Sequence, residues 1–198
     1  MNSDQILSHF KETDALLEGH FILSSGLHSG NYLQCALALQ YPADARKFGQ
    51  AIAERFVRTN SGDGRTTFGV DTVASPAIGG LIIGYAVAQA LNVRFIWTER
   101  QEGTMTLRRG FTAKEGERIL VVEDVITTGG STLECIEALE KHGANVVAAA
   151  SVIDRSGGFA DVGVPLISLV DLDVPTYEPE SCPLCESGSA AYKPGSRK

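Results

Sequence analysis

The sequence lacks any apolar run long enough to cross a bilayer, and it lacks an excess of positive charge. Its 198 residues include 17 lysines and arginines against 24 acidic residues, which gives a net charge of −7. This balance argues against general binding to nucleic acids or to membrane surfaces. The stretch MNSDQILSHFKETDALL has no long apolar block, so it predicts an amphipathic helix and not a signal peptide. We therefore expect a cytoplasmic protein with no membrane or nucleic-acid partner.

Cysteine is scarce, with four residues in the whole chain. Cys135 falls within a predicted helix, where a small buried side chain is expected. Cys182 and Cys185 have the Cys-x2-Cys spacing of half a zinc knuckle, but no clear second pair accompanies them. The sequence alone leaves metal binding or a redox role open, beside a surface turn or a local disulfide.

Two nucleotide-binding signatures are missing, because the chain contains neither Gly-x4-Gly-Lys-Ser/Thr nor Gly-x-Gly-x-x-Gly. Hydrophobic residues make up 43% and charged residues 21%, as in ordinary globular proteins, and 198 residues suit one domain with a full core. Strand and helix patterns alternate, which predicts an α/β fold with a parallel sheet flanked by helices on both faces. We divide the chain into an N-terminal helix and hairpin (1–40), an α/β core (41–175) and a C-terminal tail with the cysteine pair (176–198).

Apolar spacing gives the expected elements of the chain. Helices are predicted over residues 4–18, 41–58, 81–91 and from the turn near 131 to about 142. Strands are predicted over residues 21–23, 32–33, 67–74, 94–98, 119–122, 145–153 and 166–170. Residues 59–66 read as a loop, and residues 99–110 read as a mobile flap or a hairpin.

The stretch ILVVEDVITTGGS, residues 119–131, carries the most specific signal. A buried strand runs into the acidic pair Glu123-Asp124, and a turn rich in threonine and glycine then opens a helix. Glycines let the backbone approach a ligand closely, and free N–H groups at a helix start favour a phosphate. Carboxylates would repel a phosphate but accept hydrogen bonds from the vicinal hydroxyls of a sugar. The pattern indicates a ribose 5-phosphate site; the alternative is a solvated βα turn with a good N-cap.

EDVITTGGST resembles the motif by which type I phosphoribosyltransferases bind 5-phosphoribosyl 1-diphosphate (PRPP). Residues 21–32, with Phe21, Leu23, Ser25 and Tyr32 in register, resemble the hairpin that forms a small N-terminal hood in orotate phosphoribosyltransferases. Arg155 follows a predicted strand, where orotate enzymes carry an arginine for the substrate carboxylate. The chain is therefore similar to the orotate phosphoribosyltransferase family. The resemblance implies that PRPP and orotate give orotidine 5′-monophosphate and diphosphate, a step of pyrimidine synthesis.

The resemblance also implies roles for particular residues. Those expected to bind PRPP are Ser75, Gly79, Arg100, Glu123, Asp124, Val125, Ile126, Thr127, Thr128, Gly129, Gly130 and Ser131. Those expected to bind orotate are Ser25, Gly26, Thr127 and Arg155, and those expected to act in catalysis are Glu123, Asp124 and Arg100. Mg²⁺ is expected to arrive with PRPP, without a direct protein ligand. A homodimer with active sites shared across its interface is expected as well.

The chain departs from the family pattern at three expected lysines. Ser24 and Gly79 stand where many members have lysine, and residues 99–110 contain neither lysine nor histidine. Arg100, together with Arg108 or Arg109, is the expected replacement, since arginine can hold a phosphate through two hydrogen bonds. Two alternatives stay open: a phosphoribosyltransferase for another base such as adenine or xanthine, and a PRPP-sensing regulator on the same fold, which the lost lysines favour.

Overall fold

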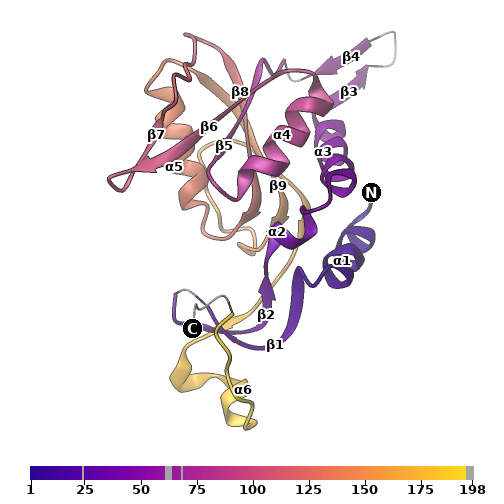
Figure 1. Ribbon diagram of the computed structural model, residues 1–198, viewed down its shortest axis with the longest axis vertical. Helices are drawn as coiled ribbons and strands as arrows, with labels where there is room; N and C mark the ends of the chain where they lie inside the picture. The colour runs from indigo at the N-terminus through magenta and orange to yellow at the C-terminus, as the bar shows by residue number, and fades with distance from the viewer. Residues whose placement is uncertain (24, 61–63, 68, 195–198) are drawn as a thin grey trace.

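The main sheet of the protein has six strands in the order β10-β9-β8-β5-β6-β7 (Figure 1). The computed structural model describes residues 1–23, 25–60, 64–67 and 69–194. The strands are β5 (Thr72–Pro76), β6 (Arg94–Gln101), β7 (Thr104–Leu107), β8 (Arg118–Ile126), β9 (Asn145–Asp154) and β10 (Leu166–Asp171). All neighbours pair in parallel except β7, which pairs antiparallel with β6. The predicted α/β fold is confirmed, with one antiparallel strand at the sheet edge.

Strand β8 is buried on both faces of the sheet. Its alternating side chains enter two separate cores: Leu120 and Val122 join one, and Ile119 and Val121 join the other. All four are 0% exposed. A strand covered on both sides reads as a continuous apolar run, which is why this segment was recognisable from sequence.

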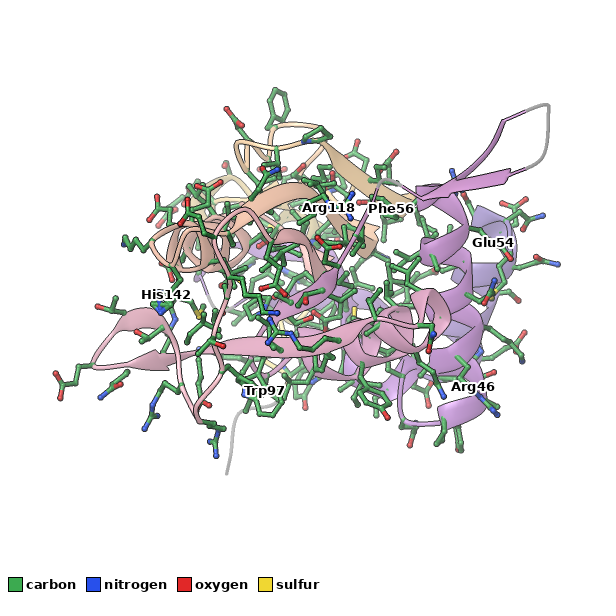
Figure 2. The ribbon with its side chains drawn as sticks, turned by 90° about the horizontal axis from the view of Figure 1, so that it is seen from above. Arg46, Glu54, Phe56, Trp97, Arg118 and His142 are labelled. Atoms are coloured by element: carbon green, nitrogen blue, oxygen red, sulfur yellow. The ribbon has the colours of Figure 1, made fainter. Side chains whose placement is uncertain are left out.

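Helices cover both faces of the sheet, as predicted. The helices α3 (Pro42–Phe56) and α4 (Gly80–Leu91) pack in the core that contains Leu120, and α5 (Gly130–Glu140) packs in the other core. From above, Glu54 of α3 and His142, which follows α5, lie at opposite sides of the molecule (Figure 2). Within the described residues, no helix has the length and apolar content needed to span a bilayer.

A second, three-stranded sheet lies below the main body in Figure 1. Its strands are β1 (Leu16–Ile22), β2 (His28–Leu33) and the C-terminal β11 (Thr176–Tyr177), in the order β1-β2-β11. We call this sheet, with α1 (Ser3–Glu12), the hood. The remaining short elements are α2 (Cys35–Ala38), β3 (Val57–Asn60), β4 (Gly64–Thr67), η1 (Pro179–Ser181) and α6 (Pro183–Glu186).

The helix predicted over residues 4–18 is wrong in its second half. Helix α1 begins after a capping box at Asn2 and ends at Glu12. Asp14 has a left-handed backbone with φ +55°, which no helix interior accommodates. Leu16 and Leu17 then belong to β1, where they pair with the end of β2. Pairing across the hairpin overrides the helical spacing of these leucines.

The predicted boundaries between residues 57 and 76 are also wrong. Of residues 59–66, expected as a loop, residues 59–60 and 64–66 belong to the antiparallel ribbon of β3 and β4. The buried strand expected over residues 67–74 starts instead at Thr72, after Gly69 turns the chain with φ +68°. Three predictions concern positions outside the described residues: the missing positive charge at Ser24, the loop at residues 61–63 and the strand position of Phe68. Of the two alternatives for residues 99–110, the structure has the hairpin, formed by β6 and β7.

Candidate active site

The site begins where two strand-to-helix turns meet at the carboxyl ends of β5 and β8. Gly79 and Gly80, at the start of α4, lie directly against the acidic pair of β8. A Cβ on Gly80 would lie 2.5 Å from Glu123 Oε2, and one on Gly79 would lie 2.8 Å from Asp124 Oδ1. Only glycine allows the backbone to come this close to the carboxylates. The preceding peptide bond, Ala77–Ile78, is cis.

Burial dominates the electrostatics of the acidic pair. Desolvation, and secondly the charge of Asp124, raise the pKa of Glu123 to about 9. Desolvation also raises the pKa of Asp124, although the backbone N–H of Val125 donates to its Oδ1 at 2.8 Å. Glu123 Oε2 is buried and accepts no hydrogen bond within the described part of the chain. Glu123 Oε2 therefore lacks the hydrogen-bond donor or cation that a bound ligand can supply.

The turn after β8 forms a small polar hollow at the start of α5. Residues 125–132 and Glu123 line a cavity of about 80 Å³. Gly129 makes the turn possible with φ +79°, and α5 begins at the next residue. Backbone N–H groups at such a helix start attract anions. The side chain of Ile126 is 1% exposed and belongs to the core, so only its backbone is available to a ligand.

A larger cavity, about 720 Å³, lies between the hood and this turn. It brings together three predicted residues that are distant in sequence: Ser25 of the hood, Thr127 of the turn and Arg155 after β9. Gly26 lies at the hairpin turn with φ +92° and does not line the cavity. Residues 173–176 line it as well. Sequence reasoning missed this last wall, because the tail shows no periodic pattern that would place it.

Phe159 is another lining residue that sequence analysis missed. Its side chain is 91% exposed at the mouth of the cavity, in a loop that follows Gly157 and Gly158. The sequence offered no signal for it, because single exposed aromatic residues are common and the fold alone decides where the loop after β9 lies.

Arg155 carries a positive charge into a partly buried place. Its backbone N–H donates to Ile126 O at 2.9 Å, which fixes its loop beside the end of β8. Burial lowers the pKa of its guanidinium. Among the described residues, no carboxylate forms a salt bridge with Arg155. The alternative role for this arginine, pairing with a nearby acidic residue, is therefore not supported by these residues. The guanidinium is available to an acidic ligand in the cavity.

Three predicted side chains do not line these cavities within the chain: Ser75, Arg100 and Asp124, which lies instead against Gly79. Ser75 is fully buried, and its Oγ faces α4 so closely that a Cβ on Gly84 would lie 2.0 Å from it. Arg100 is exposed on β6, where its Nη2 forms an ion pair with Glu134 Oε2 of α5 at 2.6 Å. The neighbouring arginines, Arg108 and Arg109, pair with Glu99.

Comparisons with known proteins agree with this architecture. The family model described as "Phosphoribosyl transferase domain" matches residues 43–163. An orotate phosphoribosyltransferase of Caldicellulosiruptor bescii is 50% identical over 198 residues, 100% of both chains. That of Thermotoga maritima is 51% identical over 187 residues, 94% of this chain and 95% of the relative. A crystal structure of orotate phosphoribosyltransferase from Aeropyrum pernix has a TM-score of 0.65 and 26% identity, covering 84% of this chain and 93% of that chain.

The fold and the acidic pair define the class as a phosphoribosyltransferase. The chain belongs to the phosphoribosyltransferase family and, within it, to the orotate phosphoribosyltransferases. The family predicted from residues 21–32, the central motif and Arg155 is thereby confirmed.

Proposed function

We propose that the protein transfers the 5-phosphoribosyl group of PRPP to orotate, giving orotidine 5′-monophosphate and diphosphate. The observation that carries this proposal is the placement of an unpaired Arg155 and of Thr127 on one cavity that adjoins the acidic pair. Orotate is a planar base with a carboxylate, and a guanidinium binds a carboxylate through two parallel hydrogen bonds. A purine base has no carboxylate to satisfy Arg155.

The sugar phosphate occupies the turn after β8 in this proposal. Backbone N–H groups and hydroxyls between Thr127 and Ser131 hold the 5′-phosphate, with help from the start of α5. The ribose hydroxyls donate to Glu123 and Asp124, which satisfies the unpaired Glu123 Oε2. Because these donors favour ionised carboxylates, binding lowers the raised pKa of Glu123 and releases a proton near neutral pH.

No covalent nucleophile is required for this reaction. The anomeric carbon passes through an oxocarbenium-like state, so the protein's work is positioning and charge stabilisation. Asp124 and Glu123, once ionised, stabilise the developing positive charge on the ribose. Mg²⁺ carried by PRPP supplies positive charge for the departing diphosphate. The oxygen-rich pair beside Gly79 and Gly80 suits a magnesium-bound ligand, since Mg²⁺ prefers oxygen and keeps several waters.

The β6–β7 hairpin extends away from the body of the chain at the edge of the main sheet (Figure 1). We infer that the hairpin reaches the diphosphate in a partner subunit and that Arg100 contributes charge there, exchanging its ion pair with Glu134. Tyr41, Ile82 and Tyr85 are exposed around a groove between the start of α3 and α4. An apolar patch of this kind suits the interface of a homodimer. Cytoplasmic location stays a prediction.

Steady-state kinetics of Arg155→Ala test the assignment of the base site. The KM for orotate should rise about 10- to 100-fold, the loss expected for a charge-assisted pair, while the KM for PRPP changes little. Arg118→Ala is the matched control, because Arg118 pairs with Asp71 at the opposite end of β8. Equal losses for both substrates would remove Arg155 from the orotate site.

A panel of bases tests the reaction itself. Diphosphate should be released from PRPP when orotate and Mg²⁺ are both present, and not with adenine or xanthine. Turnover of a purine without turnover of orotate would refute the proposed substrate. PRPP binding without turnover of any base would indicate a PRPP-sensing regulator.

A further inference from the structure

Four side chains that the reaction does not use converge where the C-terminal segment meets the hood. They are His20 on β1, His28 on β2, Cys182 before α6 and Cys185 within α6. One ligand atom from each lies within 4.8 Å of all the others. Helix α6 and the β1–β2 hairpin of the hood lie together at the end of the molecule away from the main sheet (Figure 1). We propose that this cluster is a structural zinc site that fastens the C-terminal segment to the hood.

The spacing of the four ligand atoms suits one small cation between them. His20 Nε2 lies 2.9 Å from His28 Nδ1 and 3.6 Å from Cys182 Sγ. Cys185 Sγ lies 3.3 Å from His28 Nδ1 and 3.8 Å from His20 Nε2. A tetrahedral zinc ion with ordinary bond lengths separates two nitrogens by about 3.3 Å and a nitrogen from a sulfur by about 3.6 Å. Side-chain shifts of up to about 1 Å would bring all four ligand atoms to these separations.

The orientation of His20 is fixed by a second hydrogen bond. Its Nδ1 lies 2.9 Å from the carbonyl oxygen of Ser189. A carbonyl can only accept, so Nδ1 carries the proton and Nε2 presents its lone pair to the cluster. Metal-bound histidines are held in this way, with the second ring nitrogen donating to a carbonyl or carboxylate. The C-terminal chain brackets the same residue, because Tyr192 N–H donates to His20 O at 2.9 Å.

The donor set indicates which metal binds and in what role. Two thiols and two imidazoles are a donor set that favours zinc, which they bind in a tetrahedron. Both cysteines are free, and no disulfide joins them. His20, His28 and Cys182 are buried, with 5%, 8% and 1% of their surface exposed. Four protein ligands leave no open position for substrate or water, so the site is structural and not catalytic.

Tertiary pairing assembles the site from three segments of the chain. The β1–β2 hairpin places His28 opposite Ile22, which brings both histidines to one end of the ribbon. Strand β11 pairs Tyr177 with His28, and this pairing delivers the following segment, with Cys182, to the same place. Cys182 is the N-cap of α6 and Cys185 follows three residues later within the helix, so both sulfurs lie near the histidines.

The proposed zinc site and the proposed orotate cavity share the β1–β2 hairpin. The turn of the same hairpin carries Ser25 and Leu27, which line that cavity. Ser29 of β2 donates from its Oγ to Pro175 O at 3.1 Å, and Pro175 lines the opposite wall. Zinc would therefore hold two walls of the cavity in register. This consequence rests on the proposed function, whereas the metal site itself does not.

Metal analysis of the full-length protein, prepared without a histidine tag, tests the site directly. Purified protein should contain one zinc ion per chain. Cys182→Ser and Cys185→Ser should each lower the zinc content at least about tenfold, and Cys185→His should restore it by supplying a nitrogen ligand. Cys135→Ala and His142→Gln are matched controls, since Cys135 is buried in α5 and His142 is exposed after it. Both controls should retain zinc.

Cobalt substitution of the wild-type protein keeps the test independent of the folding of the variants. Tetrahedral Co²⁺ with two thiolates should give intense visible d–d bands and a thiolate-to-cobalt charge-transfer band, and zinc should displace them. Zinc removal by a chelator should lower the Tm and raise the KM for orotate, and added zinc should reverse both. Wild-type protein that binds neither ion, with Cys182 and Cys185 freely alkylated or joined as a disulfide, overturns the proposal. Zinc content that persists in both serine variants overturns it as well.

Discussion

Replacing Glu123 with glutamine should stabilise the free protein while impairing its activity. Burial and the neighbouring Asp124 raise the pKa of Glu123 from 4.5 to about 9, so the folded protein holds a proton here at neutral pH. The unfolded chain releases that proton above pH 4.5, so the stability of the wild type falls as pH rises from 4.5 towards 9. Glutamine is neutral at every pH and has nearly the same shape.

The size of the effect follows from the gap between pH and the unfolded pKa. Each pH unit above the unfolded-state pKa lowers the free energy of unfolding by about 1.36 kcal/mol. The protonated Glu123 carboxyl therefore lowers it by about 3 kcal/mol at pH 7 and by about 1 kcal/mol at pH 5. Urea unfolding of the wild type and of Glu123→Gln, without ligands, measures both differences. The stability gain should grow by roughly 2 kcal/mol from pH 5 to pH 7.

Exposed Glu137 on α5 provides the matched control for this pH series. Glu137→Gln should give a difference in unfolding free energy that does not change between the two pH values. A gain in Glu123→Gln that is equal at pH 5 and pH 7 would refute the argument. So would a gain that shrinks from pH 5 to pH 7, because it would show that Glu123 is ionised in the folded protein.

Three further predictions concern catalysis and packing. Asp124→Asn should lower kcat by about 100-fold in an orotate turnover assay, since it removes charge stabilisation at the ribose; near-normal turnover would exclude it from the mechanism. Arg100→Ala should lower kcat by about 10-fold or more with little change in the Tm, and an unchanged rate would mean that other groups bind the diphosphate. Gly49→Ala should destabilise the protein by about 1–3 kcal/mol in urea unfolding, because the new Cβ would lie 2.6 Å from the backbone carbon of Ala86. Gly30→Ala meets nothing closer than 3.9 Å and should be tolerated; equal effects of both substitutions would contradict the packing argument.

The sequence predicted those features whose parts are contiguous. Residues 119–131 hold a strand, its acidic pair, a glycine turn and a helix start within one short stretch, so the order of residues is already the order in space. The alternation of strands and helices gave the α/β class in the same way. Residues 13–18 show the limit of this reasoning. Their apolar spacing predicted a helix, but Asp14 has a left-handed backbone and Leu16 and Leu17 pair with β2. The division of the chain at residues 40 and 175 stays a prediction.

Only the tertiary structure decided which distant groups meet. It set Gly80 against Glu123 Oε2 and so created the buried, unpaired carboxyl whose pKa is about 9. It also supplied His20 and His28 as the second pair that Cys182 and Cys185 lacked in the sequence. Hydrophobic periodicity reports the face that a segment buries, but not the partner that covers it. Desolvation and metal coordination depend on that partner, so they emerge only when the chain has folded.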